Sequence, residues 1–357
     1  MNYSKIKNFY RGKRVFLTGT TGFKGSWLSL LLDMMGAEVY GYALKPETNP
    51  SLWDIIQLDK KINITIGDIR DSESLEAAYI AANPDVVLHL AAQPIVRDSY
   101  KDPRYTYETN VMGTVNILEC LRKHPGAVSF LNVTTDKVYE NNDIENHGFT
   151  EDEKLDGYDP YSNSKSCSEL VTHSYKKSFF SEADSTAIST ARAGNVIGGG
   201  DFANDRIVPD CVRATIKGES IVVRNPYSTR PYQHVLEPLA VYLMIAMKQA
   251  EDKKYADYYN VGPGDEDCIN TGDLADYFVK FWGEPANWKN MAEKNAPHEA
   301  SFLKLDCKKV RSTFSWEPVW HVDEAIRETV EWYKAWNNKL DMAVFTREQI
   351  EKFMDMD

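Results

Sequence analysis

The segment Arg14-Val-Phe-Leu-Thr-Gly-Thr-Thr-Gly-Phe-Lys-Gly25 carries the strongest fold signal in the chain. Its first five residues have the pattern of a buried strand, and glycines follow at positions 19, 22 and 25. Glycines at this spacing allow a tight turn and bring backbone N–H groups toward a phosphate at the start of a helix. Apolar residues between Trp27 and Met35 then recur at helical spacing. This order predicts a dinucleotide site at the first strand–helix junction.

The same alternation of strand and helix continues through the first half of the chain. It specifies a parallel sheet with helices on both faces, whose ligands lie at the carboxyl ends of the strands. We therefore expect an α/β fold with a Rossmann-type doubly wound parallel sheet and a smaller mixed α/β C-terminal substrate domain. The expected division is 1–190, with a return segment near 231–262, against 191–357. Further strands are expected at 39–44, 62–67, 85–90, 128–133 and about 186–192, and helices at 71–82, 105–123 and 161–180.

Composition and charge exclude several classes of protein. The chain has 357 residues with 41 Lys+Arg against 53 Asp+Glu, a formal charge of −12, which argues against a nucleic-acid binder. No segment approaches the roughly 18–20 uninterrupted apolar residues of a membrane helix. The polar start, Met1 to Arg14, has no secretory signal, so a cytoplasmic protein is expected. The five cysteines form no CxxC pair, so no metal site is expected.

Tyr161-Ser-Asn-Ser-Lys165 is the second motif with chemical meaning. Residues four apart lie on one face of a helix. A lysine ammonium at this distance can lower the pKa of a tyrosine phenol from its usual value of about 10, which allows the phenolate to act as a base. The same ammonium can hold the ribose hydroxyls of a cofactor.

Thr134-Thr-Asp-Lys137 follows the fifth predicted strand, where its polar side chains face the crevice of the sheet. An acid beside a potential base can catalyse an elimination reaction, because one group removes a proton while the other protonates the leaving group. An ordinary Asx-type turn is the alternative interpretation. The expected catalytic residues are Thr135, Asp136, Lys137, Tyr161 and Lys165.

The remaining cofactor contacts are expected at the ends of other strands. Asp68, followed by Ile69, could bond an adenine amino group. The end of the second strand, Gly41-Tyr-Ala-Leu-Lys45, has no acid to hold a ribose 2′-hydroxyl, so this motif leaves NAD and NADP both open. The expected cofactor-binding residues are Gly19, Thr21, Gly22, Phe23, Gly25, Asp68, Ile69, Leu90, Ala91, Ala92, Tyr161 and Lys165.

Taken together, these motifs resemble the extended short-chain dehydrogenase/reductases and, within them, the nucleotide-sugar dehydratases of the NAD-dependent epimerase/dehydratase family. Distinctive matches lie at 21–28, 157–165, 192–201 and 230–239, so the resemblance covers almost the whole chain. Two positions depart from the family pattern. Thr20 stands where His is usual, and Thr135 replaces a serine.

The resemblance implies a lyase with tightly bound NAD. Tyr161 would take the C4 hydroxyl proton, with Thr135 bonding O4, and Asp136 would protonate the departing C6 hydroxyl. The base at C5 is left open between Lys137 and a water. The implied substrate is CDP-D-glucose and the product its 4-keto-6-deoxy derivative, a precursor for deoxysugar biosynthesis such as that of lipopolysaccharide O antigen. A homodimer through the helices near 105–123 and 161–180 is also implied. The expected substrate-binding residues are Gln93, Asn195, Arg206, Arg230, His234 and His298.

Three alternatives compete with this interpretation. A nucleotide-sugar 4-epimerase shares the oxidation step but does not need the Asp136-Lys137 pair. A 4,6-dehydratase could instead act on another nucleotide sugar. A non-catalytic nucleotide-sensing module of the same fold would typically lack the Tyr161 and Lys165 pair, which is intact here.

Overall fold

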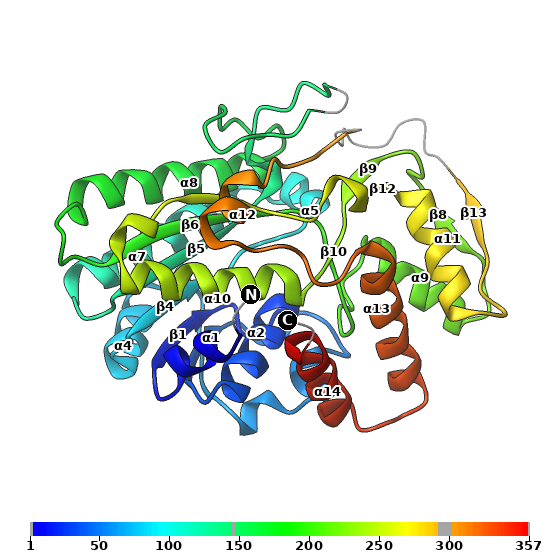
Figure 1. Ribbon diagram of the computed structural model, residues 1–357, viewed down its shortest axis with the longest axis horizontal. Helices are drawn as coiled ribbons and strands as arrows, with labels where there is room; N and C mark the ends of the chain where they lie inside the picture. The colour runs from blue at the N-terminus through cyan, green and yellow to red at the C-terminus, as the bar shows by residue number, and fades with distance from the viewer. Residues whose placement is uncertain (1–2, 145–146, 292–301, 356–357) are drawn as a thin grey trace.

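The computed structural model describes residues 3–144, 147–291 and 302–355, and its central element is a seven-stranded sheet (Figure 1). The strand order is β11-β6-β5-β4-β1-β2-β3, and every neighbouring pair is parallel. The expected doubly wound parallel sheet is thereby confirmed. The strands are β1 (Arg14–Thr18), β2 (Glu38–Ala43), β3 (Asn63–Ile66), β4 (Val86–His89), β5 (Ser129–Thr135), β6 (Ala187–Ala193) and β11 (Tyr258–Val261).

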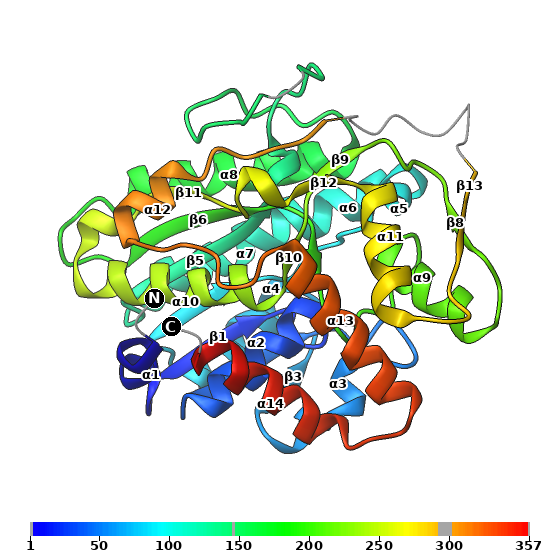
Figure 2. The ribbon, with the colours of Figure 1, turned by 45° about the vertical axis from the view of Figure 1, so that its right-hand side comes forward.

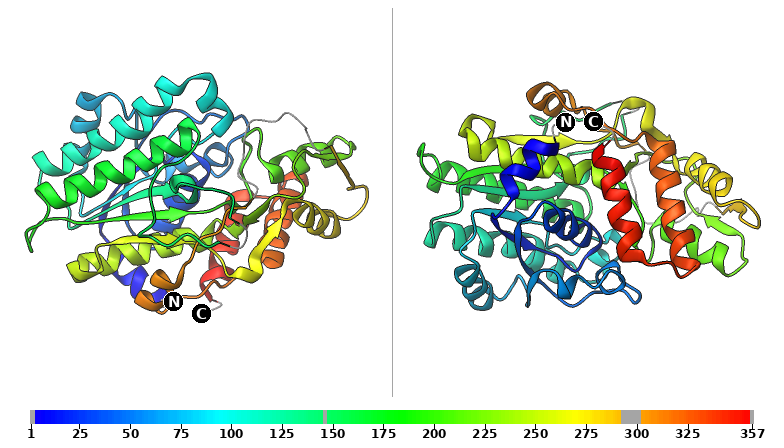
Figure 3. Two further views of the ribbon diagram at one scale, coloured as in Figure 1. Left: turned by 90° about the horizontal axis from the view of Figure 1, so that it is seen from above. Right: turned by 60° about the horizontal axis from the view of Figure 1, so that its bottom comes forward.

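Helices cover both faces of this sheet (Figure 3). Every residue of the central strands β5 and β6 is buried. Because helices cover both faces of the sheet, these strands do not alternate between buried and exposed side chains. Helix α10 is buried on nearly all sides, and Tyr10 of α1 donates a hydrogen bond to its Leu243 carbonyl oxygen at 3.0 Å. One face carries α1 (Tyr3–Tyr10), α2 (Phe23–Met34) and α10 (Leu236–Glu251); the other carries α4 (Ser72–Ala82), α7 (Gly113–Lys123) and α8 (Pro160–Phe179).

A smaller lobe stands beyond one end of the sheet, at the right in Figure 2. The chain also forms three two-stranded pairs, of which β9 with β12 is antiparallel and the other two are parallel. Two of them belong to the smaller lobe, whereas β7 with β10 lies against the central sheet, where Gln233 donates to the Val261 carbonyl oxygen at 3.2 Å. The pairs are β7 (Val196–Ile197) with β10 (Gln233–His234), β8 (Ile221–Val223) with β13 (Trp288–Asn290), and β9 (Thr229–Pro231) with β12 (Cys268–Asn270). The remaining helices are α3 (Leu52–Ile55), α5 (Val96–Lys101), α6 (Pro103–Tyr107), α9 (Ile207–Ile216), α11 (Thr271–Trp282), α12 (Lys308–Phe314), α13 (Val322–Asn337) and α14 (Met342–Asp355).

The two parts of the chain share one hydrophobic core, so they are less separate than the division at residue 190 suggests. Strand β6 continues to Ala193, beyond that boundary. The C-terminal helix α14 returns to the first lobe, where the rings of Phe353 and Tyr3 lie 5.7 Å apart and Arg347 pairs with Asp33 at 3.4 Å. Helix α14 therefore packs against α1 and also contacts α2.

The helix expected over 105–123 is present as an unbroken helical run from Pro103 to Lys123, but it is not α-helical throughout. Helix α6 passes into a π-helical turn, η2 (Glu108–Met112), before α7 begins. The buried Asn110 amide lies in this turn and donates to the Gln93 carbonyl oxygen at 3.1 Å and to Ser164 Oγ at 2.9 Å. Such turns accommodate a side chain that must reach across to neighbouring elements.

No helix within the described ranges combines the length and apolar character needed to cross a bilayer.

Candidate active site

The reversal of strand order between β1 and β4 places the candidate site at the carboxyl ends of these strands. The loops that follow them touch. Gly19 has φ +77°, and a Cβ there would lie 2.8 Å from the Ala91 backbone nitrogen. Thr18 Oγ1 accepts from the backbone N–H groups of Leu90 and Ala91, each at 3.1 Å. The predicted residues Leu90, Ala91 and Ala92 thus stand against the glycine turn, half-buried.

The glycine turn fits a dinucleotide pyrophosphate. A Cβ on Gly25 would come within 2.0 Å of the Gly19 carbonyl oxygen, so only glycine permits this close return of the chain. Helix α2 begins after Gly22, and no side chain caps its first N–H groups. Uncapped N–H groups at a helix start bind phosphate oxygens. Thr21 steadies the turn through a 2.8 Å hydrogen bond to the Leu44 carbonyl oxygen.

Three other predicted cofactor-binding residues, Asp68, Ile69 and Phe23, make contacts with other residues of the protein. The Asp68 carboxylate pairs with Arg70, whose Nη2 lies 2.6 Å from Oδ2, and this hydrogen bond lowers the pKa of Asp68. Ile69 is buried beneath Gly113, where a Cβ would come within 2.8 Å of it. Phe23 lies against Gly198, with its ring edge 3.1 Å from where a Cβ would stand. The contact of Asp68 with an adenine group stays a prediction.

The turn after β5 holds the predicted acid in a desolvated position. Thr135 Oγ1 donates to Asp136 Oδ1 at 3.0 Å. Asp136 is 1% exposed, and among the described residues its Oδ2 has no hydrogen-bond partner. Burial raises the pKa of Asp136, although Lys137 and the Thr135 hydrogen bond oppose this. A carboxyl group kept in its protonated form can donate a proton. We call residues 135–137 the reactive turn.

Helix α8 presents the predicted Tyr161 and Lys165 beside this turn. Its start is defined by Asp159, whose carboxylate accepts from the Ser162 N–H at 3.0 Å, and by Pro160 at the first helical position. Burial raises the pKa of Tyr161 to about 12, while a hydrogen bond with Thr135 acts in the opposite direction.

Lys165 is 5% exposed and donates to the Val133 carbonyl oxygen at 3.1 Å. Burial lowers the pKa of Lys165 to about 8, and the negative charge of Glu169 opposes this. The expected lowering of the Tyr161 pKa by Lys165 is not seen in this structure, because the ammonium is directed to the backbone of β5 and burial dominates the phenol.

Three of the predicted substrate residues lie on different elements, with Asn195 just after β6, Arg206 at the start of α9 and Arg230 within β9. Arg230 is buried, and its charge partly opposes the rise that burial causes in the pKa of Asp136. Arg206 is one-third exposed and pairs with Asp201 at 3.2 Å. Asn195, half-buried, accepts a backbone hydrogen bond from Gln233 at 3.1 Å.

Two other predicted substrate residues have internal roles. The Gln93 side-chain amide donates to Thr106 Oγ1 at 2.9 Å, and its oxygen accepts from the Ile95 N–H at 2.5 Å. His234 is fully buried, with ring centroids 5.8 Å from Trp27 and 4.7 Å from Trp320. The structure therefore places His234 in the core and not in the cleft. His298 lies outside the described residues.

Two residues of this region were given no role by sequence reasoning. Lys24, inside the glycine turn, lies close enough to Asp136 and Arg206 to interact with their charges; burial lowers its pKa to about 8. In the sequence, Lys24 could have been noticed because it stands inside the glycine turn. Glu169, one helical turn beyond Lys165, is fully buried and pairs with Arg192 at 3.0 Å. In the sequence, Glu169 could have been noticed because it is an acidic residue four positions after Lys165, on the face of the helix that packs against the sheet.

One group within the described ranges could offer ligands to a metal ion, namely Glu266, Asp267 and His321. Asp267 already accepts from the Val322 N–H at 2.8 Å and pairs with His321 Nδ1 at 3.0 Å. Because Val322 begins helix α13, we assign this group to helix capping.

Comparisons with known proteins agree with this geometry. Residues 16–329 match the family described as GDP-mannose 4,6 dehydratase. The chain is 46% identical over 353 residues to the CDP-glucose 4,6-dehydratase of Salmonella typhimurium strain LT2, covering 98% of each chain. Among solved structures, it resembles a dTDP-glucose 4,6-dehydratase from Bacillus anthracis in complex with NAD, with a TM-score of 0.74 at 21% identity over 92% of this chain and 99% of that one. It also resembles a UDP-glucose 4-epimerase from Thermotoga maritima, with a TM-score of 0.76 at 21% identity over 90% and 99% of the two chains.

Proposed function

The chain belongs to the GDP-mannose 4,6 dehydratase family, and from this premise we propose that it converts CDP-D-glucose to CDP-4-keto-6-deoxy-D-glucose and water. The Salmonella relative supports the choice of nucleotide sugar because its similarity extends over both whole chains. The observation that carries the reaction type is the buried Asp136 carboxyl in the reactive turn, next to Tyr161. An epimerase of the same fold has no use for such an acid.

NAD is the proposed cofactor, because the glycine turn and the uncapped start of α2 suit a pyrophosphate. The chemistry that NAD supplies when bound is reversible uptake of a hydride from the sugar. Lys165 is the residue proposed to hold the ribose hydroxyls.

The protein's own residues would move the protons. Tyr161 is the proposed base that takes the proton of the C4 hydroxyl, and Thr135 bonds the same oxygen. Because burial raises the pKa of Tyr161 to about 12 in the protein by itself, this step requires the bound cofactor and substrate to stabilise the phenolate. Oxidation at C4 makes a ketone, which acidifies the C5–H bond. Lys137, directly or through a water, removes the C5 proton as the C6 oxygen leaves with a proton from Asp136, and the C5 proton is later returned. Tyr161 gains one proton and Asp136 loses one, so the proton count of the enzyme balances when they exchange through solvent.

Residues 191–357 are proposed to bind the nucleotide end of the substrate. Arg206 and Arg230 are the candidate ligands for its pyrophosphate, because a guanidinium donates two parallel hydrogen bonds to phosphate oxygens. Asn195, two residues after the end of β6, is the third candidate.

A cytoplasmic homodimer is the proposed working form. Helices α7 and α8 lie side by side and expose Met112 at the start of α7 and Leu170 on α8, which are 49% and 52% accessible. Apolar side chains on the outer faces of two adjacent helices suit a four-helix interface between copies. A monomeric mass in light scattering would contradict this proposal. The proposed biological role is supply of a deoxysugar for a surface polysaccharide such as the lipopolysaccharide O antigen.

Incubation of the purified protein with CDP-glucose, and in parallel with GDP-mannose, dTDP-glucose and UDP-glucose, tests the function. We expect loss of one water from CDP-glucose, seen by mass spectrometry, without net formation of NADH. Unchanged mass with a new C4 epimer would instead identify an epimerase. Water loss from a different nucleotide sugar would refute the assignment of CDP-glucose as the substrate, but it would leave the dehydratase reaction in place. Absence of any turnover despite bound NAD would identify a binding module.

A further inference from the structure

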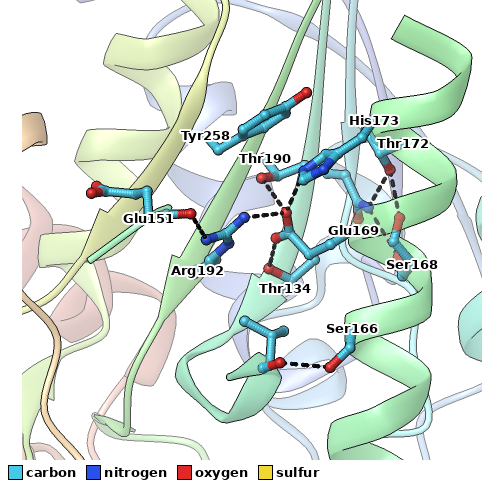
Figure 4. A network of polar contacts seen from close by, with 12 residues as sticks. Thr134, Glu151, Ser166, Ser168, Glu169, Thr172, His173, Thr190, Arg192 and Tyr258 are labelled. Carbon is cyan, nitrogen blue, oxygen red and sulfur yellow. Dashed lines mark hydrogen bonds and ion pairs between the residues drawn. The ribbon is translucent and has the colours of Figure 1, made fainter. Parts of the chain in front are cut away.

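A buried network centred on Glu169 joins helix α8 to the end of β5 and to β6 (Figure 4). The carboxylate of Glu169 accepts hydrogen bonds from Thr134 Oγ1 at 2.5 Å and Thr190 Oγ1 at 2.7 Å. It also pairs with Arg192 Nη2 at 3.0 Å and His173 Nε2 at 3.1 Å. We call Glu169, Arg192 and these contacts the Glu169 network. Glu169, Arg192, Thr134 and Thr190 are all buried, and none of them has been assigned a role in the proposed reaction.

The Glu169 network reaches the residues on both sides of the reactive turn. Thr134, immediately before the turn, donates to Glu169 Oε1. Tyr139, two residues after the turn, accepts from Arg192 Nη1 at 2.8 Å through its hydroxyl. One ion pair therefore contacts the chain just before and just after Thr135, Asp136 and Lys137.

The same network is continuous with the helix that carries Tyr161 and Lys165. Glu169 follows Lys165 by four residues, so both side chains project from the sheet-facing side of α8. Ser166, next to Lys165, donates to the Val138 carbonyl oxygen at 2.7 Å, which adds a second link between the helix and the end of the turn. The oxidation residues and the elimination residues are thus connected through buried polar contacts.

We infer that the Glu169–Arg192 pair is a positioning device that holds the acid and base of the reactive turn in register with Tyr161 and Lys165. Asp136 needs such support because, among the described residues, its Oδ1 accepts a hydrogen bond only from Thr135 of the same turn and its Oδ2 has no partner. The carboxyl therefore makes no hydrogen bond that ties the turn to a neighbouring element. Displacement of a reacting group by about 1 Å costs on the order of 100-fold in rate. The inference rests on the proposed dehydratase function.

The Thr134→Val variant tests this, because it removes one hydroxyl beside the turn and keeps the side-chain shape. Thr190→Val is the matched control. It removes a hydrogen bond to the same carboxylate, but from strand β6, away from the turn. Tyr139→Phe is a second test variant, which removes the hydroxyl that Arg192 contacts on the far side of the turn.

The measurement is a single turnover of holoenzyme with CDP-glucose, quenched at intervals, in which oxidised but undehydrated sugar and dehydrated product are separated by mass. We expect T134V and Y139F to slow water loss by about tenfold or more while C4 oxidation continues, so the oxidised sugar and reduced-nicotinamide absorbance accumulate. T190V is expected to show no accumulation, even where its melting temperature falls equally.

Equal behaviour of T134V and T190V, with no accumulation in Y139F, would overturn the inference, since the network would then serve stability alone. If T134V does not fold, Y139F against T190V decides in the same way. Failure of the wild-type enzyme to dehydrate CDP-glucose would refute the proposed function itself, so the two failures are distinguishable.

Discussion

Replacing Glu169 by Gln removes the only charge in the described structure that pairs with the buried guanidinium of Arg192. Burial alone raises the pKa of Glu169, but Arg192 and the hydrogen bonds from His173 and Thr134 outweigh it and bring the pKa to about 2. Relative to the ordinary value of 4.5, this corresponds to about 3 kcal/mol of folding free energy at neutral pH. The loss of one partner of a buried ion pair costs roughly 3–5 kcal/mol in other proteins, which agrees.

The sign of the pH dependence follows from the lowered pKa. The contribution of Glu169 is fully present above pH 4.5 and is lost as the pH falls toward 2. We therefore expect the difference in melting temperature between wild type and E169Q to be about 4 °C near neutral pH and to shrink on acidification. Differential scanning calorimetry across this pH range is the assay.

Glu119→Gln provides the control. A hydrogen bond with Arg122 is the largest cause that brings the pKa of Glu119 to about 2 as well. However, these side chains are 28% and 41% exposed, so solvent screens the pair and its loss should cost less than about 1 kcal/mol. If E169Q melts no lower than E119Q, the attribution of stability to the buried pair is refuted.

Four further outcomes are expected. Asp136→Asn should lower product formation by about 100-fold or more while oxidised sugar still forms, measured in a quenched single turnover; normal dehydration by D136N would show that another group is the acid. Wild-type product formation should fall as the pH rises through the raised pKa of Asp136, because the proton donor is then lost; a flat pH–rate profile would contradict this. Gly25→Ala should weaken NAD binding at least about tenfold in calorimetry, since its methyl group would overlap the Gly19 carbonyl oxygen, and unchanged affinity would contradict the assigned pyrophosphate site. Leu170→Glu, with Met112→Glu as a second variant, should shift the light-scattering mass from dimer to monomer, and an unchanged dimer would move the interface elsewhere.

Local pattern was sufficient for much of the first lobe. The strand at 14–18 was predicted at its observed bounds because an apolar run followed by glycines has few other solutions. The short helix α1 was missed, because only Tyr3, Ile6 and Tyr10 face the core and the segment is otherwise polar. The π turn at 108–112 was also missed, since local pattern gives no signal for it; Asn110 within it bonds to Ser164, which is distant in sequence.

The family follows from the resemblance of whole motifs to known proteins. The order of strands and helices along the chain, and the placement of reactive side chains directly after strands, follow from the sequence by itself. These depend on periodicity, turn chemistry and motif spacing, which act between residues close in the chain. The ionisation of Asp136 and the packing of His234 between Trp27 and Trp320 were decided only by the tertiary structure. So was the Glu169–Arg192 pair. Burial and pairing depend on segments that meet only after folding, and no local pattern encodes the electrostatic environment that they create.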